Sequence, residues 1–198
     1  MGQGVAIVLA ILVVLVIIWA VSTYNRLVSL REYMENALSQ IDVQLKRRFD
    51  LIPNLVESVK GYMKHERETL EAVINARARA VSAEQKASAN PRDRAAVQEL
   101  FAADAALTGA LGRLLAVVES YPDLKANESI GTLMEELRST ENRIAYARQA
   151  YNDSATRYNI YLQKFPTNIV AGMFGFQEAP LYEIVEPEQR EAPKVSFS

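Results

Sequence analysis

The chain has 198 residues, of which 49% are hydrophobic and 23% are charged, and its formal net charge is −2. A slightly acidic chain lacks the strong basic charge of nucleic-acid-binding domains, so we expect no nucleic-acid partner. The sequence has no cysteine and a single histidine, His65. Disulfides, zinc–thiolate sites, cysteine nucleophiles and multi-histidine metal sites are therefore excluded.

The N-terminal stretch is an uncharged apolar segment. Residues 4–22 carry no charge and residues 5–21 are all apolar, which is within the length range of a membrane-spanning helix. Trp19 near the end of the run and Tyr24 just beyond it suit the aromatic belt at a membrane surface. The alternative is a cleaved signal peptide that ends near Ser22, but residues 1–4 lack the lysine or arginine of a signal peptide.

The basic residues around this run predict its orientation. No lysine or arginine precedes it, whereas Arg26 and Arg31 follow it closely. The positive-inside rule then places the N-terminus outside and the rest of the chain in the cytoplasm. We therefore expect an uncleaved, single-pass membrane protein.

From Tyr24 onward the sequence has the apolar spacing of amphipathic helices. The first is predicted to continue out of the membrane to about Arg48. Pro53 lacks an amide N–H and clashes with the preceding turn, and Asp50 is placed to cap a new helix. The pattern therefore predicts a corner at residues 49–53 and a second helix over residues 51–87.

Two further helices follow. Asn90 and Pro91 have the pattern of a helix start, with asparagine as the cap and proline in the first position. This third helix is predicted to end at residues 120–122. Asn127 is predicted to cap the fourth helix, which ends before Pro166.

The predicted fold class is all-α, with an N-terminal transmembrane helix followed by an antiparallel four-helix bundle. The predicted organisation is a transmembrane anchor over residues 1–23, the bundle over residues 24–165, and an apolar segment with an extended or disordered acidic tail over residues 166–198.

An even number of antiparallel helices returns the chain to the membrane. The apolar segment 165–176 would then lie close to lipid or to a neighbouring subunit, or it would cross the bundle's own core as a strap. The predicted membrane or oligomer contacts are Trp19, Tyr24, Ile169, Val170, Met173, Phe174 and Phe176.

Three carboxylates fall at about the same level when the helices are laid antiparallel: Glu66, Asp104 and Glu141. They are the candidates for a metal site. However, the Glu-x-x-His motifs of di-metal bundles are absent from this sequence. The alternative is a buried polar network neutralised by Arg77, Arg143 or Arg148. We favour the network, and we predict no catalytic residues and no cofactor.

Other features of the sequence are given packing or surface roles. Gly61, Gly109 and Gly112 predict a close approach of the second and third helices, because glycine inside a helix destabilises it by about 1 kcal/mol. The basic run 46–48 is predicted to be a solvated corner, and the tyrosines of the fourth helix are predicted to pack in and around the core.

Long motifs in both halves of the chain resemble the LemA family. They are residues 24–31 (YNRLVSLR), 41–56 (IDVQLKRRFDLIPNLV), 59–62 (VKGY), 65–66 (HE), 107–113 (LTGALGR), 119–127 (ESYPDLKAN), 140–145 (TENRIA), 151–152 (YN), 158–159 (YN), 165–166 (FP) and 175–176 (GF). Leu38 departs from the family pattern, which has tryptophan there. The resemblance implies a single-pass protein of the bacterial cytoplasmic (inner) membrane, with a four-helix soluble domain and a short outer N-terminus. It supplies no catalytic residues.

The expected function is that of a non-enzymatic, membrane-anchored scaffold that self-associates. The expected partners are the lipid bilayer and further copies of the chain. The alternatives are a monomeric adaptor for a membrane protein and a metal-binding bundle.

Overall fold

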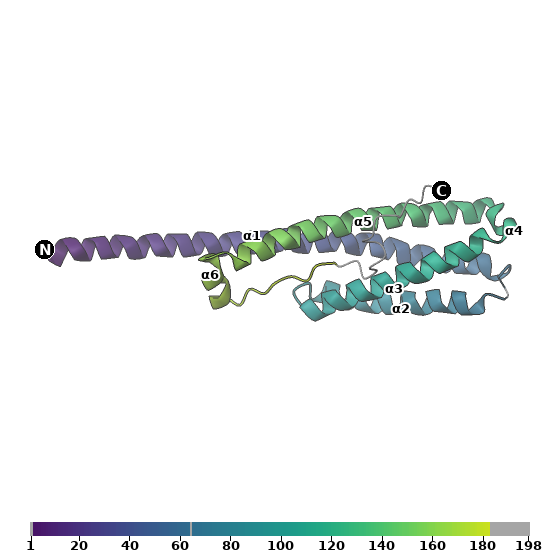
Figure 1. Ribbon diagram of the computed structural model, residues 1–198, viewed down its shortest axis with the longest axis horizontal. Helices are drawn as coiled ribbons and strands as arrows, with labels where there is room; N and C mark the ends of the chain where they lie inside the picture. The colour runs from purple at the N-terminus through teal and green to yellow at the C-terminus, as the bar shows by residue number, and fades with distance from the viewer. Residues whose placement is uncertain (1, 64, 183–198) are drawn as a thin grey trace, which may run out of the picture.

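The computed structural model describes residues 2–63 and 65–182. Within these residues the chain is helical and contains no strand. The helices are α1 (Gly2–Lys60), α2 (Arg67–Ala89), α3 (Arg94–Glu119), α4 (Pro122–Lys125), α5 (Glu128–Gln163) and α6 (Thr167–Met173). α1, α2, α3 and α5 run alternately up and down (Figure 1). The predicted all-α class, an apolar N-terminal helix followed by a four-helix bundle, is confirmed.

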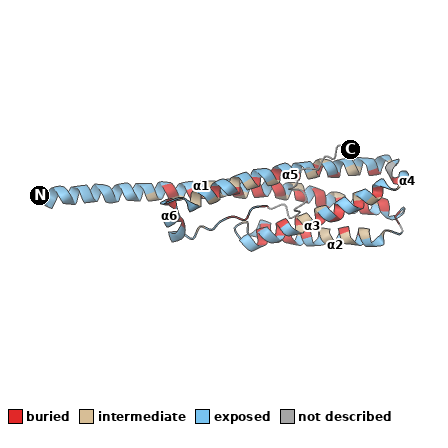
Figure 2. Cartoon of the chain, viewed as in Figure 1, coloured by how far each residue is buried: buried red, intermediate tan, exposed pale blue. Residues whose placement is uncertain are grey.

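The first third of α1 projects beyond the bundle (Figure 1), and its side chains are exposed (Figure 2). By length and composition, both α1 and α3 could cross a membrane. The apolar window of α3 is 39% buried within the bundle, whereas the window of α1 is 0% buried. Packing in the core therefore explains the apolar character of α3, and the start of α1 is left as the candidate membrane span. We call the end of the bundle from which this span projects the anchor end.

The predicted corner at Pro53 is wrong, because α1 continues through it to Lys60. A proline leaves the carbonyl four residues earlier, here that of Phe49, without its usual helical donor. Arg77 of α2 supplies a replacement, since its Nε donates to the Phe49 oxygen at 2.7 Å. Buried apolar residues lie on both sides of Pro53 and hold the two halves of α1 in the same core. Asp50 is an exposed residue inside this helix and caps nothing.

The true corner lies between Lys60 and Arg67. Gly61 belongs to this turn and not to a helix interior. An added Cβ at Gly61, Gly109 or Gly112 would meet no other atom within 4 Å. The predicted close approach of two helices at these glycines is therefore wrong.

Helix caps agree with the sequence pattern in one case and shift in the other. Asn127 caps α5 as predicted, accepting from the amides of Ser129 and Ile130 at 3.1 and 3.3 Å. At α3 the cap is Asp93 and not Asn90, because the Asp93 carboxylate accepts from the two amides that follow Arg94.

The helices pack as two pairs, α1 with α5 and α2 with α3 (Figure 1). α2 and α3 have 23 and 26 residues, whereas α5 has 36. The shorter pair therefore leaves part of α1 and α5 uncovered at the anchor end. There α6 lies beside α1, and the chain turns back along α5. We call residues 174–182 the C-terminal strap. Residues 183–198 of the predicted tail lie outside the described residues.

Candidate functional site

The core of the bundle contains a charge cluster of Arg48, Asp104, Glu141 and Arg148. Arg48 is 1% exposed and donates to Asp104, to Glu141 Oε2 at 2.6 Å and to the Thr108 hydroxyl at 3.1 Å. Arg148 donates to the other oxygen of Asp104 and to Glu141. The cluster joins α1, α3 and α5 and pairs two guanidinium groups with two carboxylates. Arg48 and Asp104 are 1% exposed, whereas Arg148 and Glu141 reach the surface, with side chains 17% and 36% exposed. Because unpaired buried charge is strongly unfavourable, this pairing is what allows Arg48 and Asp104 to be buried.

The three predicted metal ligands do not come together. Glu66 lies at the N-terminus of α2, beside the turn that follows α1, whereas Asp104 and Glu141 belong to the charge cluster. Among the described residues there is no group of three or more His, Cys, Asp or Glu side chains that could hold a metal ion. The geometric requirement of the metal-site alternative is therefore not met.

The alternative of a neutralised network agrees with the structure in one of its three arginines. Arg148 neutralises the carboxylates, but Arg77 bonds to the backbone of α1 instead. The second cation is Arg48, so the predicted solvated corner at residues 46–48 is wrong for this buried residue. Its neighbour Lys46 does lie at the surface, where it pairs with Asp42 at 2.9 Å and Glu84 at 3.3 Å.

The strap reaches the charge cluster through Tyr182. The Tyr182 hydroxyl donates to Asp104 at 2.9 Å, and the Arg148 guanidinium lies 4.5 Å from the centre of the Tyr182 ring. The pKa of Tyr182 is raised by burial and by the neighbouring Asp104 carboxylate. Burial by itself would lower the pKa of Arg148, but the charge of Asp104 raises it. Tyr182 therefore stays neutral and Arg148 stays charged in this environment.

Four side chains of α5, which we call the α5 cradle, hold the backbone of the strap: Tyr151, Asn152, Tyr158 and Asn159. The Asn159 amide bonds to both the N–H and the C=O of Ala179, each at 2.9 Å. Asn152 does the same at Tyr182, at 2.8 and 3.0 Å. The Tyr158 and Tyr151 hydroxyls donate to the carbonyls of residues 177 and 180, at 2.9 and 2.8 Å. The cradle thus acts on the strap much as a neighbouring β-strand would.

The spacing of the cradle matches an extended chain. Its two Tyr-Asn pairs are seven residues apart, which is about 10.5 Å along a helix. The strap residues that they bond, Ala179 and Tyr182, are three residues apart, which is about 10 Å in an extended backbone. The repeated pair was visible in the sequence, but its role depends on a segment that returns from α6.

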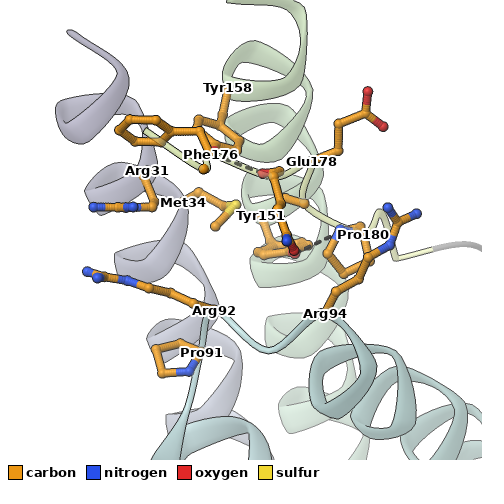
Figure 3. Close-up of a pocket in the computed structure, with 13 residues that line it drawn as sticks. Arg31, Met34, Pro91, Arg92, Arg94, Tyr151, Tyr158, Phe176, Glu178 and Pro180 are labelled. Carbon is orange, nitrogen blue, oxygen red and sulfur yellow. Dashed lines mark hydrogen bonds between the residues drawn. The ribbon is translucent and has the colours of Figure 1, made fainter. Parts of the chain in front are cut away.

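A cavity of about 240 Å³ lies beside the strap. It is lined by α1, α5, the link between α2 and α3, and the strap, and Figure 3 shows Tyr151 and Tyr158 on one side of it. Arg92 at its rim is paired with Glu35 at 2.8 Å and with Glu32 at 3.3 Å. The arginine charge at this cavity is therefore partly used in structural ion pairs.

The predicted membrane or oligomer contacts lie on α1, on α6 and at the start of the strap, and one of them, Val170, is buried. Tyr24 packs on Phe174 and Phe176, with ring centroids 4.8 and 5.6 Å apart. Ile169, Met173 and Phe174 are 53%, 75% and 60% exposed, and Trp19 on the projecting part of α1 is 39% exposed. Val170 is 3% exposed and faces the bundle, so it is not available for an outside contact.

These observations define an all-helical bundle carried on a candidate membrane helix, with a strapped anchor end and a buried, charge-balanced core. A family model described as the LemA family matches residues 37–197. The chain belongs to the LemA family.

Relatives agree with this assignment. Magnetosome protein MamQ 2 of Paramagnetospirillum magneticum is 28% identical over 202 residues, which covers 92% of this chain and 74% of the relative. Magnetosome protein MamQ of Magnetospirillum gryphiswaldense is 28% identical over 201 residues, with the same shares covered. Protein LemA of Metamycoplasma hominis is 28% identical over 165 residues, covering 83% of this chain and 71% of the relative. The candidate span of α1 supports a membrane-associated protein.

Proposed function

We propose that the protein is a non-enzymatic scaffold, anchored in the bacterial inner membrane, that works by self-association at the membrane surface. The observation that carries the proposal is the unbroken α1, which runs from the apolar segment into the bundle core. A continuous helix gives no flexible joint at which the bundle could swing. The bundle is therefore held at one attitude to the bilayer, as an assembling subunit requires.

The exposed face of α6 supports this proposal. Contact with Tyr24 fixes Phe174 only three residues beyond the end of the apolar run at Val21. Exposed Ile169 and Met173 therefore lie close to the expected membrane surface. Apolar side chains at this level can contact lipid or the anchor of a neighbouring copy. Membrane anchoring raises the effective concentration of copies, so weak contacts suffice for assembly.

Particle mass in mild detergent tests self-association. We expect oligomers from the unaltered chain and smaller particles from Met173→Asp or Phe174→Asp. Tyr146→Asp is the matched control, since Tyr146 is 75% exposed but lies in the middle of α5. Strictly monomeric particles from the unaltered chain would refute the scaffold and favour a monomeric adaptor that docks a membrane partner.

The proposed topology places the N-terminus outside and the bundle in the cytoplasm. Its support is the one-sided placement of Arg26 and Arg31, and the continuity of α1 through Ser22 favours an uncleaved anchor. Protease added to intact spheroplasts should leave the bundle undigested. Digestion of the bundle while the membrane is intact would show the opposite orientation.

A further inference from the structure

The α5 cradle recognises the strap mainly through its backbone. Its four side chains bond the N–H or C=O groups of residues 177, 179, 180 and 182. Side-chain selection is limited to the buried positions of the strap, which are Ala179, Pro180 and Tyr182. A segment that fills this site therefore needs an extended backbone, a small residue and, three positions later, an aromatic residue with a hydroxyl.

The strap is held both by these bonds and by core packing, because Ala179 and Tyr182 belong to the buried core and the Tyr182 ring lies 4.6 Å from the ring of Phe101. The cavity of about 240 Å³ lies on its α1 side, and a second one of about 440 Å³ lies on its α3 side. Gln177, Glu178 and Leu181 are exposed. The flanks of the strap are therefore open, but its departure would leave the core positions of Ala179 and Tyr182 empty.

An empty cradle, however, is unfavourable. The hydroxyl of Tyr151, which is 1% exposed, would lose its acceptor, and buried Asp104 would lose the donor from Tyr182. Unpaired buried polar groups are strongly penalised, so a departing strap has to be replaced by an equivalent segment. The segment with the matching residues at every position is the strap of another copy.

Gly175 provides the point at which a strap can change direction. Its φ is +69°, in the left-handed region that favours glycine, and it lies between α6 and the first residue bonded by the cradle. The α6 helix can stay on its own α1 while the following residues turn toward a neighbour. Residues 174–177 span at most about 14 Å, so exchange requires bundles that lie side by side.

We propose that the α5 cradle is a peptide-binding site whose exchangeable occupant is the C-terminal strap of a second copy. Exchange of straps between neighbours then links copies at the anchor end, with the same contacts that each strap makes in its own chain. This inference rests on the proposed scaffold function and names the interface through which it assembles.

Cysteine cross-linking in membranes tests the exchange, because the chain has no cysteine of its own. Gln163 Nε2 donates to Glu178 Oε1 at 2.7 Å, and both side chains are exposed. Chains with Gln163→Cys and chains with Glu178→Cys, carrying different tags, are co-expressed and treated with a short bismaleimide. Exchange predicts a cross-linked product that carries both tags.

A matched pair controls for random collision. Lys86 and Glu99 form an exposed contact at 2.7 Å between α2 and α3, which the proposal leaves within one chain. Lys86→Cys and Glu99→Cys on separate chains should give no product with both tags. Asn159→Asp, which removes the donor to Ala179, should cause loss of the strap product while helical circular dichroism is kept.

The outcomes separate this inference from the proposed function. A chain that carries both Gln163→Cys and Glu178→Cys tests for cross-linking within one copy. If only this chain gives a cross-linked product, and the particles are still oligomeric, strap exchange is overturned and the scaffold function still stands. Monomeric particles overturn both. If the Gln163–Glu178 pair and the Lys86–Glu99 control give equal yields of two-tag product, random collision explains both, and strap exchange is overturned.

Discussion

Arg77→Ala tests whether Arg77 replaces the backbone hydrogen bond that Pro53 removes from α1. The Phe49 carbonyl has no helical donor because Pro53 lacks an N–H, and the guanidinium of Arg77 takes its place at 2.7 Å. Without Arg77, the carbonyl of Phe49 has no such donor, and Phe49 is only 4% exposed. In a Pro53→Ala background, the new amide at position 53 can donate to the same carbonyl. The effect of Arg77→Ala should therefore depend on residue 53.

The expected magnitudes follow from this geometry. Loss of a hydrogen bond from a charged donor, with the acceptor left buried, costs about 1–3 kcal/mol. Since Arg77 is half-buried, we expect Arg77→Ala to lower the free energy of unfolding by about 2 kcal/mol in the original chain. In the Pro53→Ala background the loss should fall below about 1 kcal/mol, because a neutral backbone hydrogen bond replaces it. The difference is large enough to resolve against a total stability of about 5–15 kcal/mol.

Urea unfolding of the four variants, followed by far-ultraviolet circular dichroism in detergent, measures this coupling. Tryptophan fluorescence is unsuitable, since the single tryptophan, Trp19, lies in the apolar run. Arg79→Ala is the matched control, because it removes the same charge from an exposed position on the same helix. Equal losses from Arg77→Ala in both backgrounds would refute the assignment of Arg77 to the carbonyl freed by proline.

Three further outcomes are expected. Asp104→Ala leaves two guanidinium groups facing one carboxylate, so it should lower the free energy of unfolding in urea by about 3–5 kcal/mol. The double change Arg48→Met with Asp104→Leu should lower it less, because one positive and one negative charge then remain. A larger loss from the double change than from Asp104→Ala would contradict this. Burial raises the pKa of Tyr151 and Tyr182, so their contribution to stability is fully present below pH ~10 and is lost as the pH rises beyond it. In an absorbance titration these two side chains should form phenolate only well above pH ~10, after the other tyrosines, and titration of all tyrosines together near pH ~10 would count against their burial. Asn159→Ala should speed hydrogen exchange in the strap while the midpoint of global unfolding changes little, and an equal effect on both would show that the strap belongs to the cooperative core.

The sequence determined the helical class, because apolar residues recur at helical spacing through nearly the whole chain. It also predicted the cap at Asn127 and the apolar segment at the N-terminus. These features depend on residues close together in the sequence, where backbone geometry leaves few alternatives. The family resemblance was confirmed as well, since its motifs are contiguous strings of residues.

Only the tertiary structure decided the features that depend on a partner from a distant segment. Pro53 predicts a break by local rules, and the break is absent because Arg77 approaches from α2. Arg48 looks like part of a basic surface corner, yet Asp104 of α3 and Glu141 of α5 draw it into the core. A charge can be buried where opposite charges contact it. Here Asp104 and Glu141 supply them, and they lie 56 and 93 positions from Arg48 in the chain.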